Sequence, residues 1–88
     1  SVQKIVYMTT RDEKYRVLYN IISQEPHERI LVFANMKSQV RKLHDRLRRD
    51  GINCTVLSGD VPQNKRTIRL ENFRSGKVQI LIATDVAG

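Results

Sequence analysis

Four short apolar runs divide the chain, at residues 4–8, 30–34, 54–57 and 78–83. Each gap between them holds mostly polar residues, with apolar positions at helical spacing. The second and fourth runs are almost continuous in aliphatic and β-branched residues, which is typical of strands covered on both faces. The first run is more mixed, and we expect it to lie nearer an edge of the sheet.

The first gap predicts a helix that begins near Arg11 and ends before Pro26. Residues 10–13 have the Thr-x-x-Glu form of a capping box, in which two side chains satisfy free amides of the first turn. The next apolar positions have the spacing of one buried helical face. They are Val17, Leu18, Ile21 and Ile22.

The second and third gaps predict two further helices. The second helix ends at Asp50-Gly51, and the third takes Pro62 into its first turn and ends at Ser75-Gly76. The apolar face of the second helix consists of Val40, Leu43 and Leu47. We expect the apolar contacts of the third helix to come from Ile68, Leu70 and Phe73.

The order of elements, β-α-β-α-β-α-β, predicts an α/β fold with parallel strands joined by right-handed helical crossovers. The chain stops directly after the last strand, without a final crossover helix, so we expect a piece of a larger domain. In parallel α/β sheets, ligands bind outside the carboxyl ends of the strands. We therefore expect the binding residues in the segments after the strands, at 35–38, 58–63 and 84–85.

The composition adds a strong positive charge to this picture. The 88 residues include 16 Lys and Arg against 9 Asp and Glu, a formal net charge of +7, which favours a polyanion such as nucleic acid as the partner. Cys54 is the single cysteine, so we expect a reducing compartment, cytoplasmic or nuclear. No apolar run is long enough to span a membrane, and no signal-peptide pattern opens the chain, so no membrane partner is expected.

Two of the segments after the strands lead into predicted helices, whose first amides and positive dipole end favour phosphate. Gly59 would let a nucleic-acid backbone approach closely. Gln63 and Arg66 are expected to project together from the first helical turn. Such contacts hold a backbone without reading its bases. Taken singly, three residues of this edge are also ordinary turn or capping residues: Asn35, Ser58 and Thr84.

The sequence gives little support for a metal site, a catalytic nucleophile or a phosphate loop. His27 and His44 are isolated from each other and from Cys54, so neither a metal site nor a Cys-His nucleophile is expected. The many basic residues of the second helix are explained by a solvated face, with nonspecific attraction to RNA as the alternative. No Gly-x-x-x-x-Gly-Lys-Ser/Thr segment is present, so the chain lacks the phosphate loop of an NTPase. We assign no catalytic residue.

At the expected binding edge, the chain resembles the second RecA-like domain of the DEAD-box ATP-dependent RNA helicases, over essentially its whole length. Residues 30–35 resemble motif IV, and residues 57–60 and 63–66 resemble the Gly-Asp and Gln-x-x-Arg elements. Residues 83–88 resemble the opening of motif V. The residues of these motifs are most similar to those of bacterial members of the RhlB type. Residues 1–88 are accordingly expected to be a partial helicase C-terminal domain, truncated within motif V.

The resemblance implies a RecA-like parallel sheet that supplies part of an RNA groove and one edge of an ATP cleft. The first RecA-like domain of the same protein would complete both sites. Sequence-nonspecific contacts with the RNA backbone are implied for Asn35, Lys37, Gly59, Asp60, Gln63, Arg66 and Thr84. Asp85 would approach the ATP ribose. The complete enzyme would bind ATP and Mg²⁺, and an RhlB-type member would add RNA-decay machinery as a partner.

Two departures from the family pattern limit what these residues can do. Met36 stands where the family usually has a threonine in motif IV, so a hydroxyl contact with phosphate is lost there. The chain also ends before the Arg-Gly of motif V and before motif VI, whose arginines stabilise charge on the γ-phosphate. We therefore expect a parent enzyme that hydrolyses ATP and unwinds or remodels RNA duplexes, and an isolated fragment that is inactive and binds neither ATP nor Mg²⁺ tightly.

Two other functions are compatible with a small basic α/β domain. A free-standing RNA-binding module would differ from a helicase fragment by whether the gene continues past Gly88. A receiver-type signalling domain would carry acidic residues at strand ends, as Asp12, Glu13 and Asp60 do. Helix initiation already explains Asp12 and Glu13, and a net charge of +7 is an uncommon setting for a Mg²⁺ site made of carboxylates.

Overall fold

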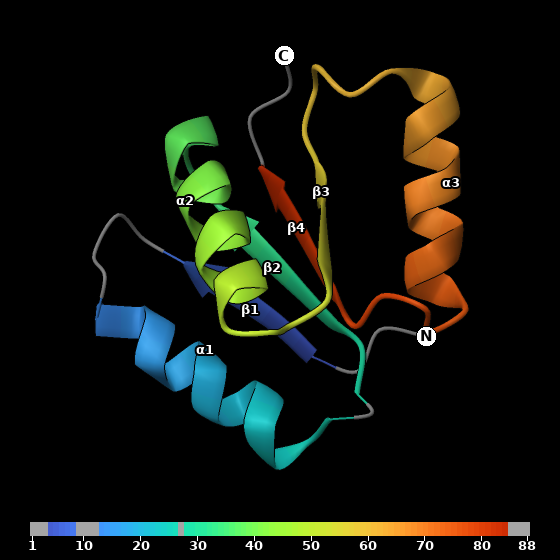
Figure 1. Cartoon of the computed structure of the whole chain (residues 1–88). Coiled ribbons are helices and arrows are strands. Elements are labelled where there is room, and N and C mark those ends of the chain that lie inside the picture. The colour runs from blue at the N-terminus through green and yellow to red at the C-terminus, as the bar shows by residue number, and fades with distance from the viewer. Residues whose placement is uncertain (1–3, 9–12, 27, 85–88) are drawn as a thin grey trace.

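The computed structural model describes residues 4–8, 13–26 and 28–84. Helices and strands alternate along them in the predicted order (Figure 1): β1 (Lys4–Met8), α1 (Glu13–Gln24), β2 (Ile30–Ala34), α2 (Lys37–Arg49), β3 (Cys54–Leu57), α3 (Gln63–Arg74) and β4 (Ile80–Thr84). The α/β class is thus confirmed. The last strand begins two residues later than predicted, because the amide of Val78 donates to the carbonyl of Asn72 and closes the end of α3 (3.1 Å). The predicted capping box lies mostly outside the described residues.

All strand pairs are parallel, and the strand order is β1-β2-β4-β3. The last strand of the sequence therefore lies between β2 and β3. Its register aligns Thr84 with Ala34 and aligns Ala83 with Leu57, so the carboxyl ends of β2, β4 and β3 finish side by side. The position of β1 at an edge of the sheet confirms what its mixed apolar pattern predicts.

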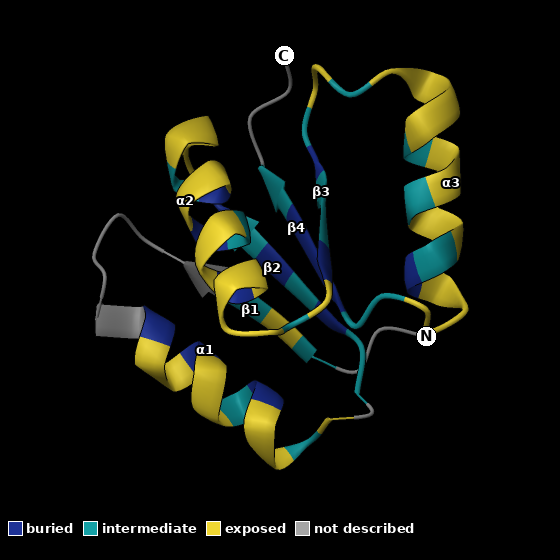
Figure 2. Ribbon diagram, in the orientation of Figure 1, coloured by how far each residue is buried: buried dark blue, intermediate teal, exposed yellow. Residues whose placement is uncertain are grey.

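The helices cover the two faces of the sheet unequally (Figures 1 and 2). One face packs against α1 and α2, and its core includes Leu18, Leu47, Ile30, Val32, Ile80 and Ile82, which are fully buried. Cys54 faces this core as predicted, and burial raises the pKa of its thiol to about 11. The other face packs against α3 through a smaller cluster of Leu57, Phe73 and Leu81. The two faces follow from the alternation of side chains along each strand.

The sheet-facing side of α3 is more polar than predicted. Phe73 is 3% exposed, but Ile68 and Leu70, which were expected to share its apolar contact, are 59% and 41% exposed. Arg66 and Arg69 face the sheet instead, at helical spacing from Phe73. Their Nη1 atoms donate to strand β3 and its following loop, at the carbonyls of Val56 (2.7 Å, from Arg69) and Ser58 (2.8 Å, from Arg66).

The predicted apolar face of α1 is also narrower than expected. Leu18 and Ile22 are buried, whereas Val17 is 57% exposed because it lies about 100° around the helix from Leu18. Tyr15 completes the buried stripe one turn earlier. Its hydroxyl donates to the carboxylate of Asp50, and the guanidinium of Arg46 lies 3.8 Å from the ring centroid. Burial, with the Asp50 carboxylate beside it, raises the pKa of Tyr15 well above its usual range.

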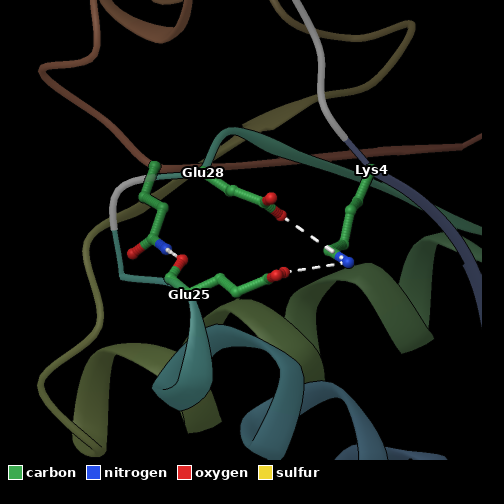
Figure 3. Close-up of polar contacts among 4 residues, drawn as sticks. Lys4, Glu25 and Glu28 are labelled. Carbon is green, nitrogen blue, oxygen red and sulfur yellow. Dashed lines mark hydrogen bonds and ion pairs between the residues drawn. The ribbon is translucent and has the colours of Figure 1, made fainter.

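Lys4 ties the edge strand β1 to the loop that follows α1 (Figure 3). Its Nζ lies 2.8 Å from Oε2 of Glu25 and 3.7 Å from Oε2 of Glu28. The hydrogen bond from Lys4 lowers the pKa of Glu25, while hydrogen bonding with Glu25 raises the pKa of Glu28. Ionisation of Glu25 therefore favours the folded state, whereas ionisation of Glu28 opposes it. Because these side chains are partly exposed, the ion pairs contribute little to the free energy of unfolding.

We expect the attachment of α3 to depend on Phe73. The variant Phe73→Ala should lower the free energy of unfolding by about 3–5 kcal/mol, because a buried aromatic side chain is replaced by a cavity. Ile68→Ala is the control on the exposed side of the same helix, and it should change that free energy by less than about 0.5 kcal/mol. Urea unfolding followed by circular dichroism measures both variants. Equal effects would contradict the observed orientation of α3.

Candidate nucleic-acid interface

The segments that follow β2 and β3 and the last residue of β4 lie at one edge of the sheet, which we name the carboxyl edge: residues 35–38, 58–63 and Thr84. The strand register brings them together, because Asn35 directly follows the aligned pair Ala34 and Thr84, and Ser58 follows Leu57 on the other side of β4. Asp85, the expected ribose contact, lies outside the described residues. The roles of these residues in RNA binding stay predictions.

Helices α2 and α3 both begin at this edge without a side-chain cap. The N-cap residue is Met36 in α2 and Pro62 in α3, and neither makes a capping hydrogen bond. Methionine and proline have no side-chain oxygen that could accept one. Neither helix has an acidic residue in its first turn. The amides of both first turns therefore face no side-chain acceptor from the cap and are suited to the oxygens of a phosphate group.

The loop between β3 and α3 is organised around Ser58. The Ser58 hydroxyl donates to the carboxylate of Asp60, and the Ser58 carbonyl accepts from the amide of Val61 (3.1 Å) and from Arg66 Nη1 (2.8 Å). The hydrogen bond from Ser58 lowers the pKa of Asp60, and the charges of Lys37 and Arg41 lower it further. Asp60 is therefore an anion at neutral pH.

Gln63 and Arg66 do not project as the free pair that their spacing predicts. Gln63 is exposed at the first position of α3, but Arg66 is half-buried and its guanidinium turns back onto the loop. One of the five guanidinium N–H donors holds Ser58. Arg66 thus positions the loop, and its other donors can serve a ligand.

A pocket of about 180 Å³ opens between α2 and this loop. Its polar lining includes Lys37 and Asp60 from the predicted set, together with Arg41, His44 and Ser58. Sequence reasoning did not assign Arg41 and His44 to the site. Their positions, four and seven residues after Lys37, place all three on one side of α2, and this spacing is the signal that could have found them.

The described residues hold no cluster of metal-ligating side chains. Among them, no group of three or more His, Cys, Asp or Glu side chains is placed to hold a metal ion. The helices in the same part of the chain are also too short or too polar to cross a lipid bilayer.

Comparison with known proteins identifies the family. The family model of the helicase conserved C-terminal domain matches residues 13–88. The chain belongs to this helicase family. Membership does not favour a receiver-type domain or a free-standing RNA-binding module, and it agrees with a binding edge at the carboxyl ends of the strands.

Similar proteins include several bacterial RNA helicases. The ATP-dependent RNA helicase RhlB of Pseudomonas putida is 51% identical over the whole of this chain, and that of Pseudomonas aeruginosa is 50% identical. RhlB of Pseudoalteromonas atlantica is 42% identical over 98% of the chain. The chain spans only 22%, 22% and 20% of the lengths of these relatives.

A solved structure supports the fold. The crystal structure of the Pyrococcus furiosus Hef helicase domain superposes with a TM-score of 0.72 and 24% identity, over 83% of this chain and 15% of that one. The parallel sheet with flanking helices is therefore RecA-like, as the resemblance implied.

We expect α2 to be less stable with Met36 at its N-cap than it would be with a side chain that accepts a hydrogen bond there. The variant Met36→Ser supplies a hydroxyl that accepts from an amide of the first turn, and it should raise the free energy of unfolding by about 1 kcal/mol. Met36→Ala, which removes the same partly exposed side chain without adding an acceptor, is the control. Thermal unfolding followed by circular dichroism compares the two. A serine variant no more stable than the alanine variant would contradict the description of this cap.

Proposed function

We propose that the chain is part of an ATP-dependent RNA helicase and supplies one side of its RNA groove and one edge of its ATP cleft. The observation that carries this proposal is the meeting of two loops, the end of β4 and two uncapped helix N-termini at the carboxyl edge of a helicase C-terminal domain. The relatives named as ATP-dependent RNA helicases, at about 50% identity over the whole chain, support it.

The RNA backbone would lie along the carboxyl edge. Its phosphate oxygens would accept hydrogen bonds from the first amides of α2 and α3, and the side chains of Lys37 and Arg66 would supply positive charge. Gly59 is exposed and presents no side chain to the approaching strand. Asn35, Gln63 and Thr84 would add neutral hydrogen-bonding groups. These contacts position a strand without reading its bases, so binding depends on salt and little on sequence.

Asp60 would act differently from the basic residues. An ionised carboxylate repels phosphate, so we assign Asp60 to holding the loop through Ser58 and to accepting a hydrogen bond from a ribose 2′-hydroxyl. That hydroxyl is present in RNA and absent from DNA. The carboxylate would therefore favour RNA over DNA at this edge.

The ATP site would be shared with the first RecA-like domain of the complete enzyme. Asp85 would approach the ATP ribose, and the phosphate loop that this sequence lacks would come from the other domain. Binding and hydrolysis of ATP with Mg²⁺ would drive closure and reopening of the two domains. The similarity to RhlB also leads us to propose a cytoplasmic enzyme that acts with RNA-decay machinery.

The double variant Lys37→Gln with Arg66→Gln removes two positive charges from the carboxyl edge. We expect its affinity for a short single-stranded RNA, measured by fluorescence anisotropy, to fall about tenfold, because two phosphate contacts are lost. The slope of log affinity against log salt concentration should become shallower by about 2. Binding of the unaltered chain is expected to be weak, because the proposed groove is completed by another domain.

The matched control is Arg16→Gln with Lys42→Gln, which removes the same charge from exposed positions of α1 and α2. Arg66 also anchors the loop, so Lys37→Gln alone is measured beside the double variant, with thermal unfolding of each. An equal loss of affinity in the control, or an affinity that does not respond to salt, would count against the carboxyl edge as the binding surface.

Asp60→Ala tests the assignment to the 2′-hydroxyl. Removing a negative charge that faces phosphate should raise the affinity for single-stranded DNA about threefold. The affinity for the matching RNA should rise less, because a contact with ribose is lost, so the preference for RNA narrows. Asp45→Ala, an exposed carboxylate on α2 that pairs with His44 at 3.6 Å, is the control for charge. An unchanged ratio of RNA to DNA affinity would remove Asp60 from the recognition of ribose.

A further inference from the structure

The opposite edge of the sheet carries a second concentration of positive charge. Helix α2 ends there with Arg46, Arg48 and Arg49, and α3 ends there with Arg74. Figure 1 shows these two helix ends at the same end of the molecule, beside the loops that lead into β3 and β4. We name the basic residues of this edge the amino-edge patch: Arg29, Arg48, Arg49, Arg74 and Lys77.

Hydrogen bonds hold the segments of the amino-edge patch together. Nη1 of Arg48 donates to Oδ1 of Asn53 (3.3 Å), and Nδ2 of Asn53 donates to the carbonyl of Lys77 (2.9 Å). Nη1 of Arg29 donates to the carbonyl of Arg74 (3.1 Å). These bonds join the end of α2 to the loops before β3 and β4, and they join the loop before β2 to the end of α3. A ligand therefore meets an organised surface rather than separate side chains.

The acidic residues of this edge do not cancel the positive charge. Asp50 accepts a hydrogen bond from the neutral Tyr15 hydroxyl and keeps its negative charge, which offsets one cation, and Glu28 lies beside Lys4. Glu71 lies on α3 about one turn before its end and offsets one cation of the patch. The amino edge therefore keeps a net positive charge. This charge lies away from the carboxyl edge, where the family resemblance places RNA.

Stabilisation of helix ends does not account for the whole patch. Basic residues near the carboxyl end of a helix offset the negative end of its dipole, which explains the positions of Arg48, Arg49 and Arg74. The last carbonyls of α2 already accept from the amides of residues 50–52, and the guanidinium of Arg48 reaches Asn53 instead. Lys77 lies three residues after the end of α3, but only its carbonyl takes part in the hydrogen bonds of the described residues, so its ammonium group is not used to cap that helix.

The surroundings of the patch fit a phosphate backbone better than a protein or an unstacked strand. Most of the large hydrophobic side chains that are exposed in the described residues lie elsewhere: Val17, Tyr19, Met36 and Ile68. The two near this edge, Ile5 on β1 and Leu70 one turn before Arg74, are separate side chains on different elements. A protein interface would have an apolar centre, and a single-strand site would have aromatic side chains for stacking. The patch has instead a shallow recess of about 260 Å³ between Arg48 and residues 51–53.

We propose that the amino-edge patch is a second RNA-binding surface, which holds the phosphate backbone of an RNA duplex. The choice of RNA rests on the proposed helicase function, and the choice of a duplex rests on a cationic surface that offers no stacking partner. The two edges lie at opposite ends of the strands. A duplex held at the amino edge would therefore keep RNA near the protein while a single strand occupies the carboxyl edge, which raises its effective concentration there.

The test compares Arg48→Gln with Lys77→Gln, as a double variant, with the control Arg16→Gln and Lys42→Gln. Arg48→Gln gives up one exposed hydrogen bond to Asn53, and Lys77 contributes only its carbonyl to the described hydrogen bonds, so we expect both double variants to fold, as thermal unfolding will verify. We expect the amino-edge variant to bind a short blunt-ended RNA duplex about tenfold more weakly than the control does, with a salt slope shallower by about 2.

Single-stranded RNA separates this inference from the function on which it rests. We expect the amino-edge variant to bind the single strand as the control does, and Lys37→Gln with Arg66→Gln to bind the duplex as the control does. A duplex affinity equal in the amino-edge and control variants would overturn the second surface, whatever the carboxyl-edge variant does. A polyglutamate peptide and an unlabelled RNA duplex are also compared as competitors at equal concentration of negative charge. If the peptide displaces the bound duplex and the unlabelled duplex does not, the proposal is overturned in favour of an acidic protein partner.

Discussion

Parallel pairing of β4 with both β2 and β3 joins the sheet into one unit. Ile80 and Ile82 are fully buried in this position and contact the core under α1 and α2. Because β4 separates β2 from β3, the loops after these two strands reach the same edge only when residues 80–84 are in place. The carboxyl edge, and with it the proposed RNA groove, therefore depends on the last strand of the described chain.

Polar groups connect this sheet to its outer helix and to the site at once. On the inner side of α3, two arginines and one phenylalanine meet β3 and its loop. Arg66 holds the carbonyl of Ser58, whose hydroxyl donates to the carboxylate of Asp60. A hydrogen bond between a guanidinium and a carbonyl is directional, so it fixes the loop more closely than an apolar contact would. The same side chain stabilises the fold and is available to a phosphate group.

The two ends of α2 and α3 give the two edges of the sheet different chemical character. At the carboxyl edge, Met36 and Pro62 leave the first turns of α2 and α3 without side-chain acceptors, which gives up some stability and keeps amides for a ligand. At the amino edge, the same helices end in arginines, and the hydrogen bonds through Asn53 bring Lys77 to them. One orientation of the helices thus produces one edge with uncapped amides and a second edge with a cluster of cations.

The sequence alone determined the order of elements, the edge position of β1, the burial of Cys54 and which segments follow the strands, because apolar periodicity and parallel crossovers depend on local pattern. It did not determine the place of β4 between β2 and β3, the exposure of Val17, Ile68 and Leu70, or the turning of Arg66 and Arg69 toward β3. These features, like the pocket that joins Arg41 and His44 to Asp60, were decided by tertiary structure. Periodicity shows that a helix has sides, but only packing selects which side meets the sheet and which distant carbonyl a long side chain can reach.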